Sequence, residues 1–82
     1  MKYNQLLQKL AKFGIVQIAR LTIEGGDDIA YLGRQELNVF PFAFDCYPVY
    51  LDNGTESLVD PYIVRCIARR FDLEESKLIT IN

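Results

Sequence analysis

The sequence predicts a single α+β domain over residues 1–82, in the order helix, three antiparallel strands, helix. Three observations lead to this fold class. Apolar residues recur three and four apart near the N-terminus, as in an amphipathic helix. β-Branched residues and glycine-containing turns dominate the middle of the chain, as in a meander of strands. An aspartate and a proline then precede a second stretch with helical spacing, so helices and a sheet are expected to pack as two layers.

The length and composition fit one cytoplasmic domain. The chain is 50% hydrophobic and 24% charged, which is typical of a globular protein. No apolar run approaches the roughly 20 residues of a membrane span, and the polar N-terminus lacks the apolar block of a signal peptide. The two cysteines, Cys46 and Cys66, lie far apart in the chain and are expected to be reduced.

The first helix and the first strand have clear sequence signals. The helix is expected over Tyr3–Phe13 and should end at Gly14, because glycine readily takes the left-handed conformation that follows a helix. The β-branched stretch Ile15–Ile23 predicts a strand. In a regular strand, the polar side chains of Gln17 and Arg20 would lie on opposite faces, so each face would contain one of the two.

The following strands are predicted from turns. Glu24–Asp27 contains two adjacent glycines and predicts a hairpin to a second strand at 28–33. A third strand is expected at Leu37–Phe44, where Pro41 favours the edge of the sheet. The segment Tyr47–Leu51 is a candidate for a short fourth strand.

The last part of the chain is predicted to be mainly helical. Asp60 and Pro61 have the side chains preferred at the cap and the first position of a helix. The apolar residues that follow at helical spacing are Ile63, Val64, Ile67, Ala68 and Phe71. One further helical turn is expected within Leu73–Leu78.

The residue types present exclude several kinds of chemistry. The chain has no histidine, which removes the commonest general base and transition-metal ligand. It also lacks a glycine-rich phosphate loop, closely spaced cysteine pairs and a nucleophile beside a base. We therefore expect no metal and no cofactor. A net charge of −2 and a pI of about 4.9 count against nucleic-acid binding, which depends on neutralising phosphates.

A series of short motifs runs along nearly the whole chain. In order, these are Tyr3-x-x-Leu6 continuing through Leu10 to Gly14, a strand with Arg20, Gly25-Gly26, an aromatic strand around Tyr31, Pro41, and Pro61 followed by Val64-Arg65-x-Ile67-Ala68-Arg69 and Leu73. The series covers about residues 3–78 and resembles the HicA (YcfA-like) toxins of type II toxin–antitoxin pairs. The resemblance implies a double-stranded-RNA-binding-like fold, metal-independent mRNA cleavage and an antitoxin partner that covers the active surface.

The catalytic histidine that this resemblance implies is missing. In the family it follows a glycine at the start of the second strand, and here Asp28 takes its place, or Asp27 if the register shifts by one residue. An exposed aspartate is a poor general acid at neutral pH, and its charge repels RNA phosphates. We therefore expect little or no cleavage and assign no catalytic residue. The two aspartates also suggest a divalent-cation site, but the simpler interpretation is that aspartate suits the turn.

Three sets of side chains are candidates for a binding surface. The RNA-binding candidates are Lys9, Lys12, Arg20, Arg65, Arg69 and Arg70; for the helix arginines the simpler interpretation is a solvent-exposed helix side. The candidates for an interface with a protein partner or a second copy of the chain are Tyr47, Val49, Tyr50 and Leu51, since exposed aromatics and strand edges often mark interfaces. The alternating Phe40, Phe42 and Phe44 are expected to be buried beneath the helices, the alternative being a base-stacking platform.

Two functions follow from the sequence. The preferred one is a HicA-like, non-catalytic interaction module that binds a protein partner or itself. The alternative is an RNA-binding protein or a weak mRNA interferase. The acidic pI, the absence of histidine and the aromatic segment Asp45–Ser57 favour the first.

Overall fold

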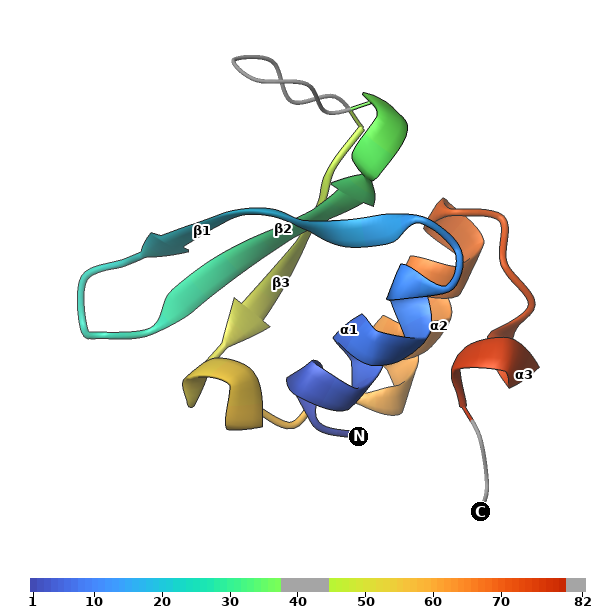
Figure 1. Cartoon of the computed structure of the whole chain (residues 1–82). Helices are drawn as coiled ribbons and strands as arrows, with labels where there is room; N and C mark the ends of the chain where they lie inside the picture. Colours follow the sequence, from blue (N-terminus) through green and yellow to red (C-terminus); the bar gives the residue numbers. More distant parts are fainter. Residues whose placement is uncertain (38–44, 80–82) are drawn as a thin grey trace.

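Helices pack against one side of an antiparallel sheet (Figure 1). The computed structural model describes residues 1–37 and 45–79. The elements in chain order are α1 (Tyr3–Ala11), β1 (Ile15–Thr22), β2 (Asp28–Arg34), the 3-10 turn η1 (Gln35–Leu37), β3 (Tyr47–Leu51), the 3-10 turn η2 (Gly54–Glu56), α2 (Pro61–Arg70) and α3 (Glu75–Leu78). The predicted α+β class and its order of helix, three strands and helix are confirmed, with α3 as the extra helical turn expected near the C-terminus.

Side chains and backbone conformation set both ends of α1. At its start, the backbone N–H of Lys2 donates to Oε1 of Gln5 at 3.0 Å, which satisfies a group that precedes the helix. At its end, Gly14 takes a φ of 75° and its N–H donates to the carbonyl of Ala11. The glycine stop predicted from the sequence is therefore present, although regular helix ends at Ala11 rather than Phe13.

The third strand of the sheet is not the predicted segment. β3 pairs antiparallel with β2 in the order β1-β2-β3, and it occupies Tyr47–Leu51, the segment expected to give a fourth strand. Leu37, where the third strand was expected to begin, lies in η1, and residues 38–44 are outside those described. Pro48 is tolerated because β3 is an edge strand, where a missing N–H leaves the inner ladder intact.

A β-bulge in β1 determines which side chains face the helices. The pairing register shifts between Gln17 and Ala19. Gln17 pairs with Leu32, and Arg20 pairs with Ala30. Leu32 and Ala30 are both fully buried. Gln17 and Arg20 therefore lie on the same, helix-covered face, whereas a regular strand would have placed them on opposite faces.

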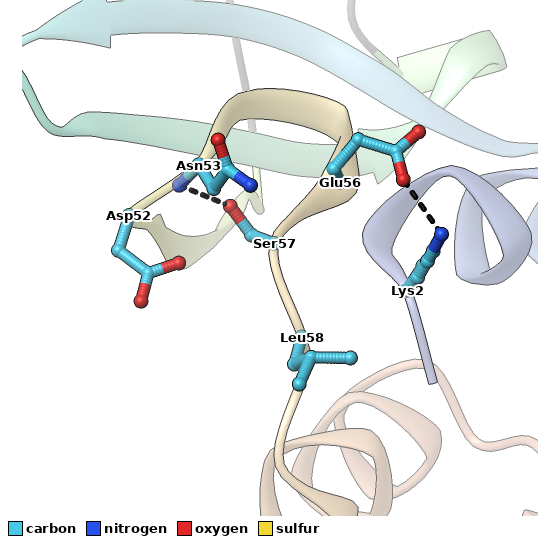
Figure 2. A pocket seen from close by; sticks show the side chains of 6 residues that line it. All are labelled: Lys2, Asp52, Asn53, Glu56, Ser57 and Leu58. Carbon is cyan, nitrogen blue, oxygen red and sulfur yellow. Dashed lines mark hydrogen bonds and ion pairs between the residues drawn. The ribbon is translucent and has the colours of Figure 1, made fainter.

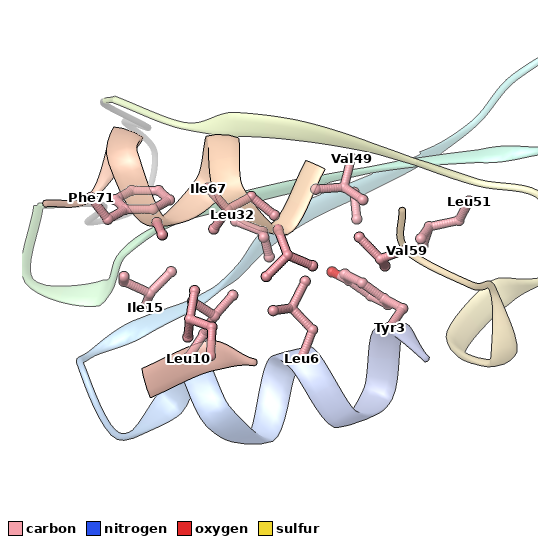
Figure 3. Packing of buried hydrophobic residues seen from close by; sticks show 14 residues of the cluster. Tyr3, Leu6, Leu10, Ile15, Leu32, Val49, Leu51, Val59, Ile67 and Phe71 are labelled. Atoms are coloured by element: carbon pink, nitrogen blue, oxygen red, sulfur yellow. The ribbon is translucent and has the colours of Figure 1, made fainter. Parts of the chain in front are cut away.

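The hydrophobic core lies between the sheet and the helices (Figure 3). Its buried residues come from every helix and every strand: Tyr3, Leu6, Leu10, Ile15, Ala30, Leu32, Val49, Leu51, Val59, Val64, Ile67, Ala68, Phe71 and Leu78. Figure 1 shows α1, α2 and α3 on the same side of the sheet. The smallest dimension of the molecule is 17 Å, about the thickness of one helix layer on one sheet layer.

The second helix begins as its sequence predicts. The carboxylate of Asp60 accepts the N–H of Tyr62 at 2.7 Å, and Pro61 occupies the first helical position. At the other end, Asp72 takes a φ of 56°, so that an aspartate fills the left-handed position that usually belongs to glycine. In the described part of the chain, no helix has the length and apolar character needed to cross a membrane.

Candidate functional site

The arginines expected to bind RNA are mostly paired within the chain. Arg20 pairs with Asp28 and Arg70 with Asp45, while Arg65 Nε lies 3.2 Å from a carboxylate oxygen of Glu75. These carboxylates neutralise much of the positive charge that binding to RNA phosphates would require. The remaining candidates lie elsewhere: Lys9 in the last turn of α1, Lys12 as its C-cap residue, and Arg69 on the exposed side of α2.

Asp28, at the position of the family's histidine, is held by a local network. Its carboxylate accepts the hydroxyl of Thr22 at 2.8 Å and Nε of Arg20 at 2.7 Å. The Thr22 hydrogen bond and then the Arg20 hydrogen bond hold the pKa of Asp28 below its ordinary value. A carboxylate held in its ionised form is a poor proton donor at neutral pH. The geometry therefore assigns Asp28 a structural role between β1 and β2.

We expect Asp28→Asn to be less stable than the wild type at pH 7, but not at low pH. Because the folded-state pKa of Asp28 is lowered, its stabilising contribution is present above its ordinary pKa near 4 and is lost as the pH falls through the folded value. Urea unfolding at pH 7, 5 and 3 should show the two midpoints converging on acidification. Glu74→Gln is the matched control, because the exposed Glu74 carboxylate forms no hydrogen bond or ion pair with the residues that the structure describes. A constant difference across the pH range would contradict this role.

The four candidates for a protein interface separate into two groups. Val49 and Leu51 are 2% and 0% exposed and belong to the core, so they are not available to a partner. Tyr47 is half-buried, and burial followed by the interaction with Cys66 raises its pKa. Tyr50 is 59% exposed and lies on the opposite face of β3. Of the four, Tyr50 is the residue best placed to contact another molecule.

Tyr50 belongs to a larger apolar surface, which we call the open sheet face. It is the side of the sheet opposite α1, α2 and α3, and it consists of Ala19, Leu21, Ile29, Tyr31, Pro48 and Tyr50. The register pairs Ala19 with Tyr31, Leu21 with Ile29, Ile29 with Tyr50 and Tyr31 with Pro48, so these side chains adjoin one another. Leu21 is 55% exposed. None of the six carries a charge.

One end of the open sheet face is acidic. The hydroxyl of Tyr50 donates to the carboxylate of Asp27 at 2.8 Å. This hydrogen bond is the main cause of a raised pKa at Tyr50, with smaller contributions from burial and from the negative charges of Asp27 and Asp52. Asp27 contacts the phenol directly, and Asp52 follows Tyr50 by two residues in the chain. We call the part of this face at Asp27, in the turn before β2, and Asp52, directly after β3, the acidic end.

A shallow hollow of about 510 Å³ lies beyond the end of β3 (Figure 2). It is lined by Lys2, Asp52, Asn53, Glu56, Ser57 and Leu58. Most of its polar groups bind one another: Lys2 pairs with Glu56 at 2.8 Å, and the Asn53 N–H donates to Oγ of Ser57 at 2.7 Å. These contacts stabilise the η2 turn against the start of α1. The polar side chains that line the hollow therefore have a structural role.

The remaining candidates are the two cysteines and the aspartate pair of the hairpin turn. Among the described residues, neither Cys46 nor Cys66 takes part in a disulfide, as expected from the sequence. Among residues 1–37 and 45–79, no group of three or more carboxylates and thiols could hold a metal ion. Asp27 and Asp28 lie on opposite faces of the hairpin, since one binds Tyr50 and the other binds Arg20. They are therefore not arranged as a pair that shares one cation.

Comparison with known proteins adds no relative. No family model, no curated protein and no solved structure matches this chain. The HicA-like resemblance therefore rests on the sequence motifs alone and stays a prediction. The open sheet face was in part detectable from the sequence, because Tyr50 was predicted as an interface residue. Its other members, Ala19, Leu21, Ile29, Tyr31 and Pro48, were not predicted to lie at an interface.

Proposed function

We propose that this chain is a protein-binding module that docks a partner on the open sheet face. One observation carries the proposal: Leu21 and Tyr50, 55% and 59% exposed, lie on a continuous apolar surface with Ile29 between them. Single exposed apolar residues are common on proteins and need no explanation. A contiguous apolar face bordered by polar groups is instead typical of interaction sites, in which aromatic residues are enriched.

An RNA-directed function of the HicA-like kind has weaker support. The order of elements agrees with the fold that the resemblance implies, and this agreement is the main argument for it. Against it, Arg20, Arg65 and Arg70 each pair with a carboxylate of the chain. Asp28 in addition accepts two side-chain donors as an ionised group, which disfavours a role as the general acid of RNA cleavage.

A selection from a displayed library of random twelve-residue peptides, with the full chain as the immobilised target, tests the proposed function. We expect selected peptides to bind the wild type and to lose at least about tenfold in affinity on Leu21→Asp. A tenfold loss corresponds to about 1.4 kcal/mol, a modest effect for a carboxylate forced into an apolar contact.

Leu58→Asp is the matched control for this selection. Leu58 is 77% exposed but follows η2 and is not part of the open sheet face, so the same substitution there should leave peptide binding unchanged. Circular dichroism would verify that both variants are folded. Peptides that bind Leu21→Asp as tightly as the wild type, or a library that yields no binder, would contradict the proposed function.

A further inference from the structure

We infer that the partner presents a lysine or arginine next to its apolar residues, and that this cation binds at the acidic end of the open sheet face, at Tyr50 and Asp27 with Asp52 two residues after Tyr50. The inference rests on the proposed function and specifies the chemistry of the occupant. It identifies the partner as a different protein with a basic flank, not as an acidic protein or a second copy of this chain.

The acidic end of the open sheet face provides the first argument. Asp27 and Ile29 alternate along the hairpin on the same side of β2, and Tyr50 is the direct partner of Ile29. The phenol of Tyr50 bonds to Asp27 at 2.8 Å, which brings a carboxylate to the edge of an exposed ring. A cation above this ring would be attracted both by its π face and by the carboxylate beside it.

The second argument is that no basic side chain of the described residues forms an ion pair with these carboxylates. Some acidic side chains of the described structure pair with basic ones, as in Lys2–Glu56, Arg20–Asp28 and Arg65–Glu75. No ion pair within residues 1–37 and 45–79 involves Asp27 or Asp52. The negative charge at this end of the face is therefore available for a partner with complementary charge, which would raise the association rate and select against acidic partners.

The same charges argue against a second copy as the occupant. The six residues of the open sheet face include no lysine or arginine. The nearest basic residue of the hairpin, Arg20, lies on the opposite, helix-covered face and is paired with Asp28. Two copies stacked through this face would bring apolar surfaces together, but its six residues would offer no cation to Asp27 or Asp52 of either copy.

Three fluorescein-labelled peptides test the inference by fluorescence anisotropy with the full chain. They share a core of alternating valine and threonine and differ only in the two residues at each end, which are lysine, glutamine or glutamate. We expect the lysine peptide to bind about five- to tenfold more tightly than the glutamine peptide, and the glutamate peptide to bind most weakly. This advantage should shrink at high salt, because the pair lies at a solvent-exposed rim.

The double variant Asp27→Asn/Asp52→Asn should remove the lysine advantage while the glutamine peptide binds as before. Asparagine at position 27 can still accept the Tyr50 hydroxyl, so the local structure is preserved. The control Asp72→Asn/Glu74→Gln removes the same net charge from exposed positions between α2 and α3, away from the open sheet face, and should retain the full advantage. Asparagine also suits the positive φ of residue 72.

The outcomes separate this inference from the proposed function. If all three peptides bind equally and Leu21→Asp abolishes binding, the face binds proteins but the basic partner is wrong. If none binds and the library selection also fails, both are wrong. A wild-type dimer in sedimentation velocity that Leu21→Asp dissociates would replace the basic partner with a second copy of the chain.

Discussion

Replacing Leu32 with alanine is expected to destabilise the protein by about 2–5 kcal/mol. Leu32 lies in the central strand β2 and is 0% exposed, packed between the sheet and the helices (Figure 3). Truncation removes buried methyl groups and leaves a cavity that the surrounding side chains fill only partly. Since domains of this size are stable by only about 5–10 kcal/mol, urea unfolding should show a large fall in the midpoint.

Leu21→Ala is the matched control, because it is the same substitution on the opposite face of the same sheet. Leu21 is exposed, so its truncation should cost less than about 1 kcal/mol in unfolding free energy. Leu21→Ala should nevertheless weaken binding of the selected peptides. Leu32→Ala, as long as it remains folded, should bind them as the wild type does. Similar losses of stability in both variants would mean that the open sheet face is covered in solution and would contradict its proposed role.

Much of the fold could be predicted from local sequence signals. The helical spacing from Tyr3, the glycine stop at Gly14 and the cap formed by Asp60 with Pro61 each predicted an observed boundary to within two residues. The hairpin was also predictable, since Gly25 and Gly26 take φ values of 100° and 93°, which side chains other than glycine rarely adopt. These features depend on neighbouring residues only.

The choice of the third strand depended on long-range pairing and was not predictable in the same way. Leu37–Phe44 and Tyr47–Leu51 both have the apolar and aromatic composition of a strand, and the sequence favoured the first. The structure pairs Tyr47–Leu51 with β2, which buries Val49 and Leu51 in the core. A short apolar run cannot by itself show with which strand it will pair.

The bulge explains why the candidate site was only partly visible in the sequence. A strict alternation through β1 would put Gln17 and Arg20 on opposite faces, so neither face would appear uniformly apolar. The register shift moves both polar residues to the helix-covered face, where they bind Tyr3 and Asp28. The other face retains Ala19 and Leu21. A register shift has no reliable local signal in the residues, and the open sheet face depends on it.

Tyr3→Phe is expected to be less stable than the wild type at pH 7 and to lose this disadvantage at high pH. Burial is the main cause that raises the pKa of Tyr3 from 10.0 to about 12, and the positive charge of Arg20 opposes it. At neutral pH the variant loses the hydrogen bond from the phenol to Oε1 of Gln17, 2.8 Å long, which contributes about 0.5–1.5 kcal/mol. Above pH 10 the unfolded wild type releases the phenolic proton before the folded protein does. This lowers the unfolding free energy of the wild type, whereas the variant has no phenol at position 3 and is not affected in this way.

The sign of this effect follows from the raised folded-state pKa. The stability that depends on neutral Tyr3 is complete below pH 10 and declines as the pH rises toward 12, by on the order of 2–3 kcal/mol over the two pH units. The difference in unfolding free energy between wild type and Tyr3→Phe should therefore shrink and then reverse across this range. Gln17→Leu separates the two causes, because it removes the same hydrogen bond but keeps the phenol, and so should retain the alkaline decline. If the unfolding free energy of Tyr3→Phe fell with pH as steeply as that of Gln17→Leu, the Tyr3 phenol would not be the buried group that limits stability at high pH.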